Sequence, residues 1–176
     1  MIRYMLVAVL SSIVALLLFA ATRPDSFRVE RSTLVQAPPA AIQPLIEDFH
    51  RWTAWSPWEH RDPAMKRTYS GAERGIGAAY AWEGNSEVGS GRMEILESTP
   101  QKIVIKLDFI TPFEGHNTAE FTLVPEGNST RVGWAMFGPA NYLSKVMGLL
   151  FNMDKMIGKD FEAGLASLKT AAETQK

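Results

Sequence analysis

The spacing of apolar residues in this 176-residue chain changes at Gly138-Pro139, and that change limits the possible folds most. Between residues 65 and 137, apolar and polar residues alternate in short runs, which is typical of strands with one buried face. After Gly138-Pro139, apolar residues recur every three or four positions, which is typical of an amphipathic helix. The chain is therefore expected to form an antiparallel sheet and then a helix that covers it.

The strand-like runs are rich in β-branched and aromatic residues and end at glycine, proline or asparagine. Alternation is clearest in the run 102–110, where every second residue from Ile103 to Phe109 is apolar. The segment 125–129, Pro-Glu-Gly-Asn-Ser, separates the last two runs and predicts a β-hairpin. The expected strands cover residues 27–36, 65–70, 78–83, 90–98, 102–110, 117–124 and 131–137.

Two helices are expected beside the sheet. Pro39 stands at the start of a short helix, and a continuous amphipathic helix of about 30 positions is predicted after Gly138-Pro139. Gly158 and Gly164 each cost about 1 kcal/mol relative to alanine inside a helix, so they suggest a close approach to the sheet. The fold class is α+β: a helix-grip fold, in which a curved antiparallel sheet of six to seven strands wraps a long C-terminal helix.

The N-terminal residues form a candidate membrane segment. Tyr4 to Ala21 is an apolar run interrupted only by Ser11 and Ser12, and as a helix it reaches about 27 Å, close to the hydrocarbon thickness of a bilayer. An uncleaved anchor is favoured over a cleaved signal peptide, because the apolar region of a signal peptide is normally shorter. We expect an anchor at 1–22, a linker at 23–26 and one domain at 27–172. Basic residues flank both ends of the anchor, so the side of the membrane that the domain occupies stays open.

Charge and residue content exclude several classes of function. The chain has 18 basic and 19 acidic residues, so it lacks the basic field that nucleic-acid binding needs. It has no cysteine, and its three histidines lack metal-ligand spacing. No GxSxG motif is present, and the Gly75-Ile76-Gly77 segment leads into a strand instead of a helix. No metal, cofactor or nucleic acid is expected, and the sequence names no protein partner.

Several segments together resemble the START-like superfamily, also called SRPBCC, which includes polyketide cyclase/dehydrase-type and Bet v 1-like proteins. The resemblance covers residues 27–170 and is closest to a membrane-anchored bacterial subfamily, which implies a location in the bacterial inner membrane. It implies a helix-grip fold with a hydrophobic ligand cavity, and it does not imply cyclase activity. The segments that carry it are VERS at 29–32, APP at 37–39, WSPWE at 55–59, YSG at 69–71, GAAYAWEGN at 77–85, MEILES at 93–98 and MDKMIGKDFEAGLASLK at 153–169.

Aromatic and methionine side chains are the candidate ligand-binding residues. Trp52, Trp55 and Trp58 are three residues apart, so they share one face of a helical or 3₁₀ turn. They either pin the short helices onto the sheet or line the mouth of a cavity. Further candidates are expected on the concave face or on the C-terminal helix, where apolar walls suit apolar ligands and core packing is the competing interpretation. These are Tyr80, Trp82, Met93, Phe109, Phe121, Trp134, Met136 and Met153, with Met147 and Met156 nearby.

Three functions remain open from the sequence. The first is membrane-tethered binding of a hydrophobic small molecule or lipid between the sheet and the C-terminal helix. The second is a cyclase- or dehydratase-type enzyme that uses a pocket carboxylate or His60 as general base. The third is a non-catalytic interaction or regulatory module. No catalytic residue is assigned, because strand alternation puts most polar strand residues on the outer face, among them Glu83, Glu94, Asp108, His116 and Glu120.

Overall fold

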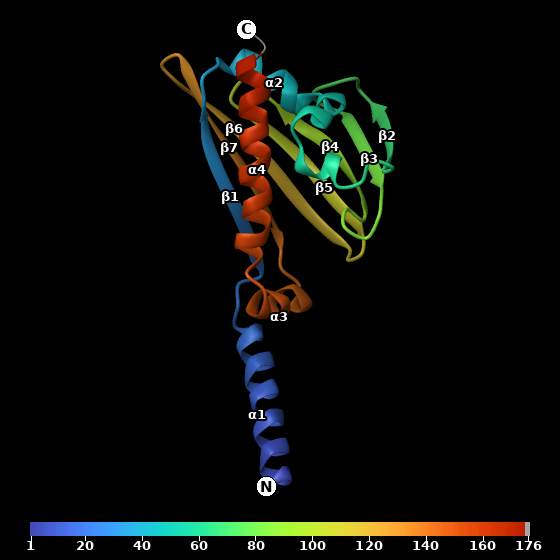
Figure 1. Cartoon of the computed structure of the whole chain (residues 1–176), viewed down its shortest axis with the longest axis vertical. Coiled ribbons are helices and arrows are strands. Elements are labelled where there is room, and N and C mark those ends of the chain that lie inside the picture. Colours follow the sequence, from blue (N-terminus) through green and yellow to red (C-terminus); the bar gives the residue numbers. More distant parts are fainter. Residues whose placement is uncertain (175–176) are drawn as a thin grey trace.

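The computed structural model describes residues 1–174 and has an elongated outline, with one helix projecting from an α+β domain (Figure 1). Helix α1 leads into strand β1, a short helix and two 3₁₀ helices, and six more strands precede the last two helices. The bounds are α1 Ile2–Ala21, β1 Ser26–Val35, α2 Pro39–Glu47, η1 Phe49–Ala54, η2 Pro57–His60, β2 Lys66–Gly71, β3 Ala78–Glu83, β4 Ser90–Ser98, β5 Lys102–Thr111, β6 Gly115–Glu126, β7 Ser129–Pro139, α3 Tyr142–Leu150 and α4 Met153–Thr174.

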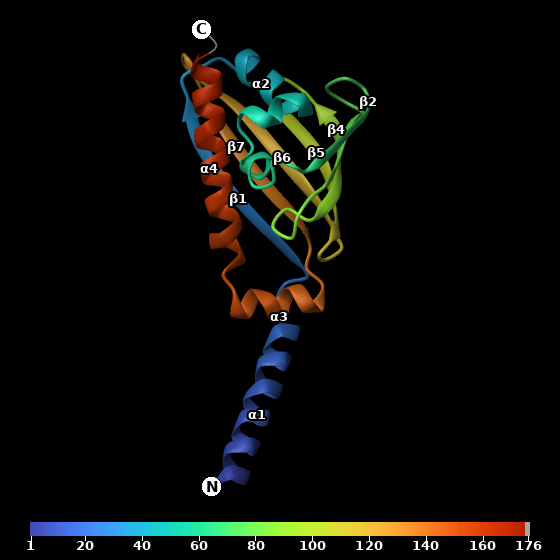
Figure 2. The ribbon, with the colours of Figure 1, turned by 45° about the vertical axis from the view of Figure 1, so that its right-hand side comes forward.

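The seven strands form one antiparallel sheet in the order β1-β7-β6-β5-β4-β3-β2. β6 and β7 are joined by a two-residue turn, in which Gly127 has a φ of 61° and Glu126 pairs with Ser129. This confirms the predicted hairpin. The apolar residues that alternate along each strand point to the concave face, where α2, the two 3₁₀ helices and α4 cover them (Figures 1 and 2). The helix-grip α+β fold is confirmed.

Helix α4 approaches the sheet closely at Gly164. The ring of Trp134 stacks on that of Phe161 with centroids 4.2 Å apart and an interplanar angle of 6°. A Cβ atom at Gly164 would lie 2.7 Å from Cζ3 of Trp134 and 3.1 Å from Cδ of Pro57. The absence of a side chain at Gly164 therefore lets the rings of Trp134 and Pro57 pack against α4, and this is the close approach that the sequence suggested.

Replacing Gly164 by alanine should lower the free energy of unfolding by about 1–3 kcal/mol, because overpacking this contact costs more than the gain in helix propensity. Gly148 in α3 is the matched control, since a Cβ there meets no atom within 4 Å. Gly148→Ala should leave stability unchanged or raise it by up to about 1 kcal/mol. Thermal unfolding of the full-length variants, followed by far-UV circular dichroism in nanodiscs, measures both. Equal effects of the two substitutions would contradict the close contact.

The prediction of one continuous helix after Gly138-Pro139 is wrong in one respect, because the segment forms two helices. The backbone of Phe151 is extended, with φ −126° and ψ 134°, and this interrupts the helix between α3 and α4. Oδ1 of Asn152 accepts a hydrogen bond of 2.9 Å from the backbone N–H of Lys155, so Asn152 acts as an N-cap for α4. Oδ1 of Asn141 caps α3 in the same way through Ser144. α3 consequently lies across the axes of α1 and α4 (Figure 2).

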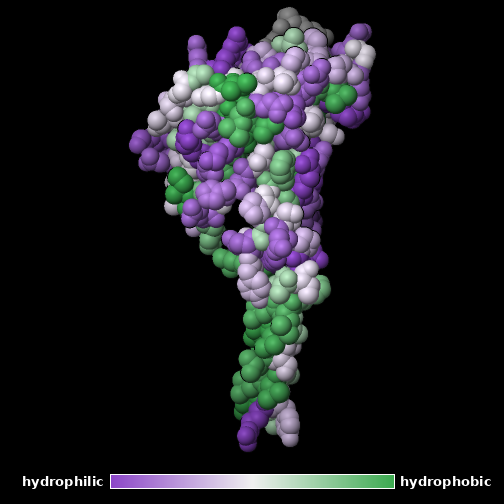
Figure 3. Space-filling view, turned by 180° about the vertical axis from the view of Figure 1, so that it is seen from behind, coloured by the Kyte–Doolittle hydropathy of each residue, from purple (hydrophilic) through white to green (hydrophobic). Residues whose placement is uncertain are grey.

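Helix α1 stands outside the domain. It has 20 residues and a mean hydropathy of 2.5, and it is the one helix in residues 1–174 that is long and apolar enough to cross a membrane. Only Ala20 among its residues is buried. Its surface is apolar along most of its length, whereas the domain surface above it is mainly hydrophilic (Figure 3). A signal sequence would have the same length and composition.

Candidate functional site

The aromatic residues predicted on the concave face form one connected cluster. Trp134 is its centre, because its ring contacts those of Trp55, Phe121 and Phe161 at centroid distances of 5.5, 5.0 and 4.2 Å. Trp58 adds an edge contact to Trp134 at 5.6 Å. These contacts fill the space between the sheet and the middle of α4.

Trp52 and Trp55 also hold α2 in place. Nε1 of Trp52 donates to the carbonyl of Ile46 at 2.9 Å, and Nε1 of Trp55 donates to the carbonyl of Leu45 at 2.8 Å. Both carbonyls belong to the last turn of α2, where no intrahelical donor is available. The side chains of both tryptophans are at most 4% exposed. The structure thus places these two residues in the core, and Trp58 is half-buried.

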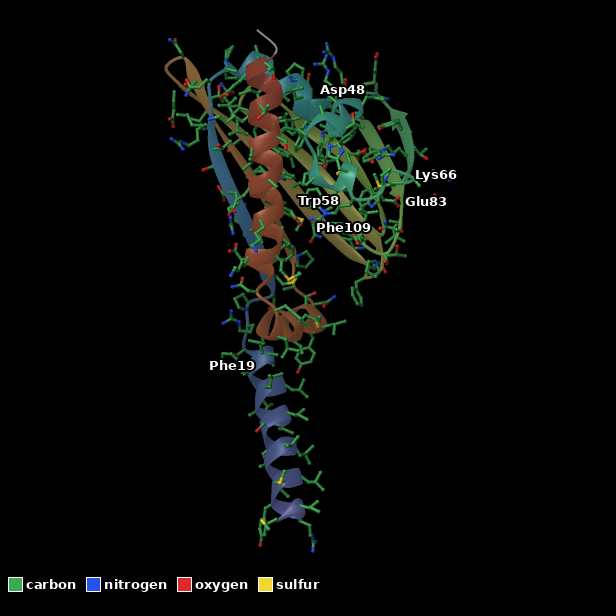
Figure 4. The ribbon with its side chains drawn as sticks, in the orientation of Figure 1. Phe19, Asp48, Trp58, Lys66, Glu83 and Phe109 are labelled. Carbon is green, nitrogen blue, oxygen red and sulfur yellow. The ribbon has the colours of Figure 1, made fainter. Side chains whose placement is uncertain are left out.

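Burial on the concave face differs between its two halves. In the half nearer the C-terminal end of α4, Ile95, Ile103 and Phe121 are fully buried. In the half nearer α3, Leu107, Met136 and Trp82 are 8–9% exposed, and Phe109 is half-buried. We call this second region the open half; its residues are Trp58, Trp82, Met93, Leu107, Phe109, Asn117 and Met136. Figure 4 labels Trp58 of η2 and Phe109 of β5 close to each other beside α4.

The open half exists because the N-terminal part of α4 does not lie over the centre of the sheet. Near its start, Gly158 packs against the guanidinium of Arg31 on β1, and that guanidinium binds Asp154 and Glu162 at 3.0 and 2.8 Å. These ion pairs hold the first turns of α4 over the β1 edge of the sheet. The helix axis therefore diverges from β4, β5 and β6 towards α3 (Figure 2), and Leu107 and Met136 on that side keep 8–9% exposure.

Two small or polar residues shape the open half, and neither was predicted as a site residue. Gly91 has room only for hydrogen, since a Cβ there would lie 2.5 Å from Cζ2 of Trp82; this lets the indole lie across β4 and meet Phe109 edge-on at 5.9 Å. Asn117 pairs with Leu107 and shares the concave face with Ala119. Asn117 is half-buried, and it is the one residue of the open half that has an amide side chain. Strand alternation counted back from Phe121 would have found it.

The remaining predicted site residues lie at different places. Tyr80 is buried beside Met93, its cross-strand neighbour. Met153 is 42% exposed at the start of α4, and Met147 and Met156 are also exposed, so the three methionines do not form a wall of the concave face. A shallow surface depression lies at the α3 end of β1 and β7, where Phe27, Phe137 and Gly138 line it.

A buried carboxylate, that of Glu59, lies beside the aromatic cluster. Oε1 of Glu59 accepts a hydrogen bond of 2.7 Å from the Tyr80 hydroxyl, and Oε2 accepts one of 2.7 Å from Nε of Arg67. Burial and the neighbouring Glu59 carboxylate raise the pKa of Tyr80 well above its usual range, so the phenol stays a donor. The hydrogen bond to Glu59 likewise raises the pKa of Arg67. All three groups are engaged with one another.

The other titratable groups considered as bases have different surroundings. Asp62 is buried, and its carboxylate accepts backbone hydrogen bonds from Ala64 at 3.0 Å and Asn85 at 2.7 Å, which fix two loops. His60 is exposed. His116 and Asp108 pair on the outer face at 2.8 Å, and this hydrogen bond raises the pKa of His116. Residues 1–174 contain no group of three histidine or acidic side chains arranged to hold a metal ion.

Comparison with known families agrees with this architecture. Residues 26–173 match the family described as "Polyketide cyclase / dehydrase and lipid transport". The chain belongs to this family. It matches none of the curated protein sequences with which it was compared.

Solved structures with the same fold include the Zhui aromatase/cyclase from Streptomyces sp. R1128. It has a TM-score of 0.63 and 13% identity, over 84% of this chain and 94% of that one. A protein of unknown function from Staphylococcus aureus has a TM-score of 0.62 and 14% identity, over 85% and 95%. Protein CV1439 from Chromobacterium violaceum has a TM-score of 0.58 and 14% identity, over 86% and 99%. These identities establish a shared fold and no more.

Proposed function

We propose that this protein binds a hydrophobic small molecule or lipid in the open half of the concave face while α1 tethers it to a membrane. The observation that carries the proposal is the difference in burial between the two halves. Ile95, Ile103 and Phe121 are 0% exposed in one half, whereas in the other half Trp82, Met93, Leu107 and Met136 are buried with 7–9% exposure and Phe109 and Trp58 are half-buried. Such a concave apolar surface gains free energy when an apolar ligand covers it.

The polar groups near this surface favour binding over turnover. Glu59 and Asp62 are buried carboxylates of the kind that a general base requires, and both are occupied by the hydrogen bonds described above. Asn117 has both a donor and an acceptor, and it can orient the polar end of a ligand without proton transfer. The family description, which names lipid transport as well as polyketide cyclases and dehydrases, is compatible with this function.

Binding can be tested with the full-length protein in nanodiscs and a photoactivatable, clickable fatty acid. Illumination should attach the probe to peptides that contain Trp58, Phe109 or Met136. Phe109→Asp should reduce this labelling about tenfold or more, because the ligand loses an apolar contact and meets a charge. Ile110→Asp is the matched control, since Ile110 is the next residue of β5 and is 60% exposed on the opposite face. It should label like the unaltered protein.

Two results would contradict the proposal. One is labelling confined to α1, which would show only that the probe partitions into lipid around the anchor. The other is an equal loss in both variants while circular dichroism shows that both are folded. Conversion of the bound probe to a new product, detected by mass spectrometry, would instead favour the enzyme hypothesis.

A further inference from the structure

Helix α3 exposes a set of large apolar side chains that the domain does not cover. Leu143, Met147 and Leu150 are 55, 36 and 59% exposed, and Phe151, which follows the helix, is 49% exposed. Their spacing of four, three and one residues places them along one side of α3. Gly148 lies away from this side, because two residues turn a helix by about 200° and so separate it from Leu150. α3 is therefore amphipathic, and its apolar side keeps between 36 and 59% of these side chains exposed although the helix also contacts α1.

The position of α3 identifies what covers that side. The Tyr142 hydroxyl donates a hydrogen bond of 2.8 Å to the carbonyl of Leu17, in the last turns of α1. Nζ of Lys145 pairs with the carboxylate of Asp25, just after α1 ends. These two contacts hold α3 against the C-terminal end of α1, and α3 runs across the axis of that helix (Figure 2).

The length of α1 sets the level of α3 relative to a bilayer. Twenty residues of helix reach about 30 Å, which matches the hydrocarbon core, so the last turn of a membrane-spanning α1 lies at the boundary between acyl chains and headgroups. Tyr142 lies at that boundary, where tyrosine is enriched in membrane proteins. The charged residues Arg23 and Asp25 follow within four residues of Ala21 and belong to the aqueous side.

We infer that α3 lies flat in the interfacial layer of the bilayer as a second membrane contact, with Leu143, Met147, Leu150 and Phe151 inserted among the lipids. This rests on the proposed function in one respect, that α1 spans the membrane. It adds an orientation: the α3 end of the domain, where the concave face is open, is held against the lipid surface. A hydrophobic ligand then moves between bilayer and open half without crossing bulk water.

The absence of cysteine from the chain makes site-directed spin labelling a direct test. Single cysteines at Leu143 and Leu150 report on the exposed apolar side, and one at Gly148, where an added Cβ meets no atom within 4 Å, reports on the same helix away from it. Leu10→Cys reports on the middle of α1, and Lys159→Cys, exposed on α4, reports on water. The full-length protein is reconstituted in phosphatidylcholine vesicles, and accessibility to oxygen and to a water-soluble nickel complex is measured for each label.

Labels at Leu143 and Leu150 should show a ratio of oxygen to nickel accessibility at least about threefold higher than the label at Gly148, and intermediate between those at Leu10 and Lys159. A ratio at Leu143 and Leu150 equal to that at Lys159 would overturn the inference, even if the Leu10 label is in lipid and the tether is intact. An aqueous ratio at Leu10 would overturn the tether separately. Spin–spin broadening at Leu143 that disappears on dilution with unlabelled protein would place a second copy of the chain on α3 and also overturn the inference.

Discussion

Glu59→Ala should lower the free energy of unfolding by about 3 kcal/mol, because it leaves Arg67 and the Tyr80 hydroxyl without their common partner. The side chain of Glu59 is 4% exposed and that of Arg67 is 23% exposed. Breaking a buried pair costs about 3–5 kcal/mol, and the partial exposure of Arg67 puts this one at the lower end of that range. For a chain of this size the melting temperature should fall by roughly 6–12 °C. Thermal unfolding in nanodiscs, followed by far-UV circular dichroism, measures the shift.

An ion pair on the neighbouring strands provides the control. Lys66 and Glu83 pair at 3.3 Å across β2 and β3, and their side chains are 68 and 69% exposed (Figure 4). Glu83→Ala should change stability by less than about 1 kcal/mol, since exposed pairs contribute little. Glu59→Gln should lie between the two, because the amide keeps an acceptor for Tyr80 and loses the charge that holds Arg67. If Glu59→Ala were no more damaging than Glu83→Ala, the buried cluster would not stabilise the fold.

The sequence predicted the sheet well because its signals are local. Each strand carries its own alternation, and the segment 125–129 specifies a tight turn without reference to the rest of the chain. The break between α3 and α4 was missed because helical spacing continues through it, from Leu150 to Met153 and Ile157. The signal that marks the break is Asn152, a residue that favours an N-cap, placed two positions before Asp154 in the first turn of α4.

The site was predicted less completely because it depends on tertiary contacts. Arg67 and Tyr80 lie 8 and 21 residues after Glu59 in the sequence. The three side chains meet only because η2 folds over β2 and β3. Residue type identified the aromatic wall, and it could not separate its filled half from its open half. That division follows from where α4 crosses the sheet, and Arg31 with its two acidic partners joins the first turns of α4 to β1.

Trp55→Ala should be among the most destabilising single substitutions in the domain, at about 3–5 kcal/mol. The indole is 1% exposed, its Nε1 donates to the Leu45 carbonyl at 2.8 Å, and its ring meets those of Trp52 and Trp134 at 4.8 and 5.5 Å. Truncation therefore leaves a cavity and an unpaired carbonyl at the end of α2. A fall in melting temperature of roughly 6–20 °C in nanodiscs is expected.

Trp58→Ala tests the other interpretation of the same tryptophan cluster. Trp58 is half-buried at the edge of the open half, and its ring contacts those of Trp134 and Phe161 at 5.6 and 6.3 Å. Within residues 1–174 its indole N–H, unlike that of Trp55, makes no hydrogen bond to the protein. Its truncation should cost about 1–2 kcal/mol, less than that of Trp55, because the partly accessible site leaves a smaller buried void. Labelling by the photoactivatable fatty acid should nevertheless fall several-fold in Trp58→Ala, since the ligand loses a wall of its site. If Trp58→Ala lost stability as Trp55→Ala does and kept normal labelling per folded molecule, all three tryptophans would belong to the core. The ligand site would then be confined to the sheet residues around Phe109.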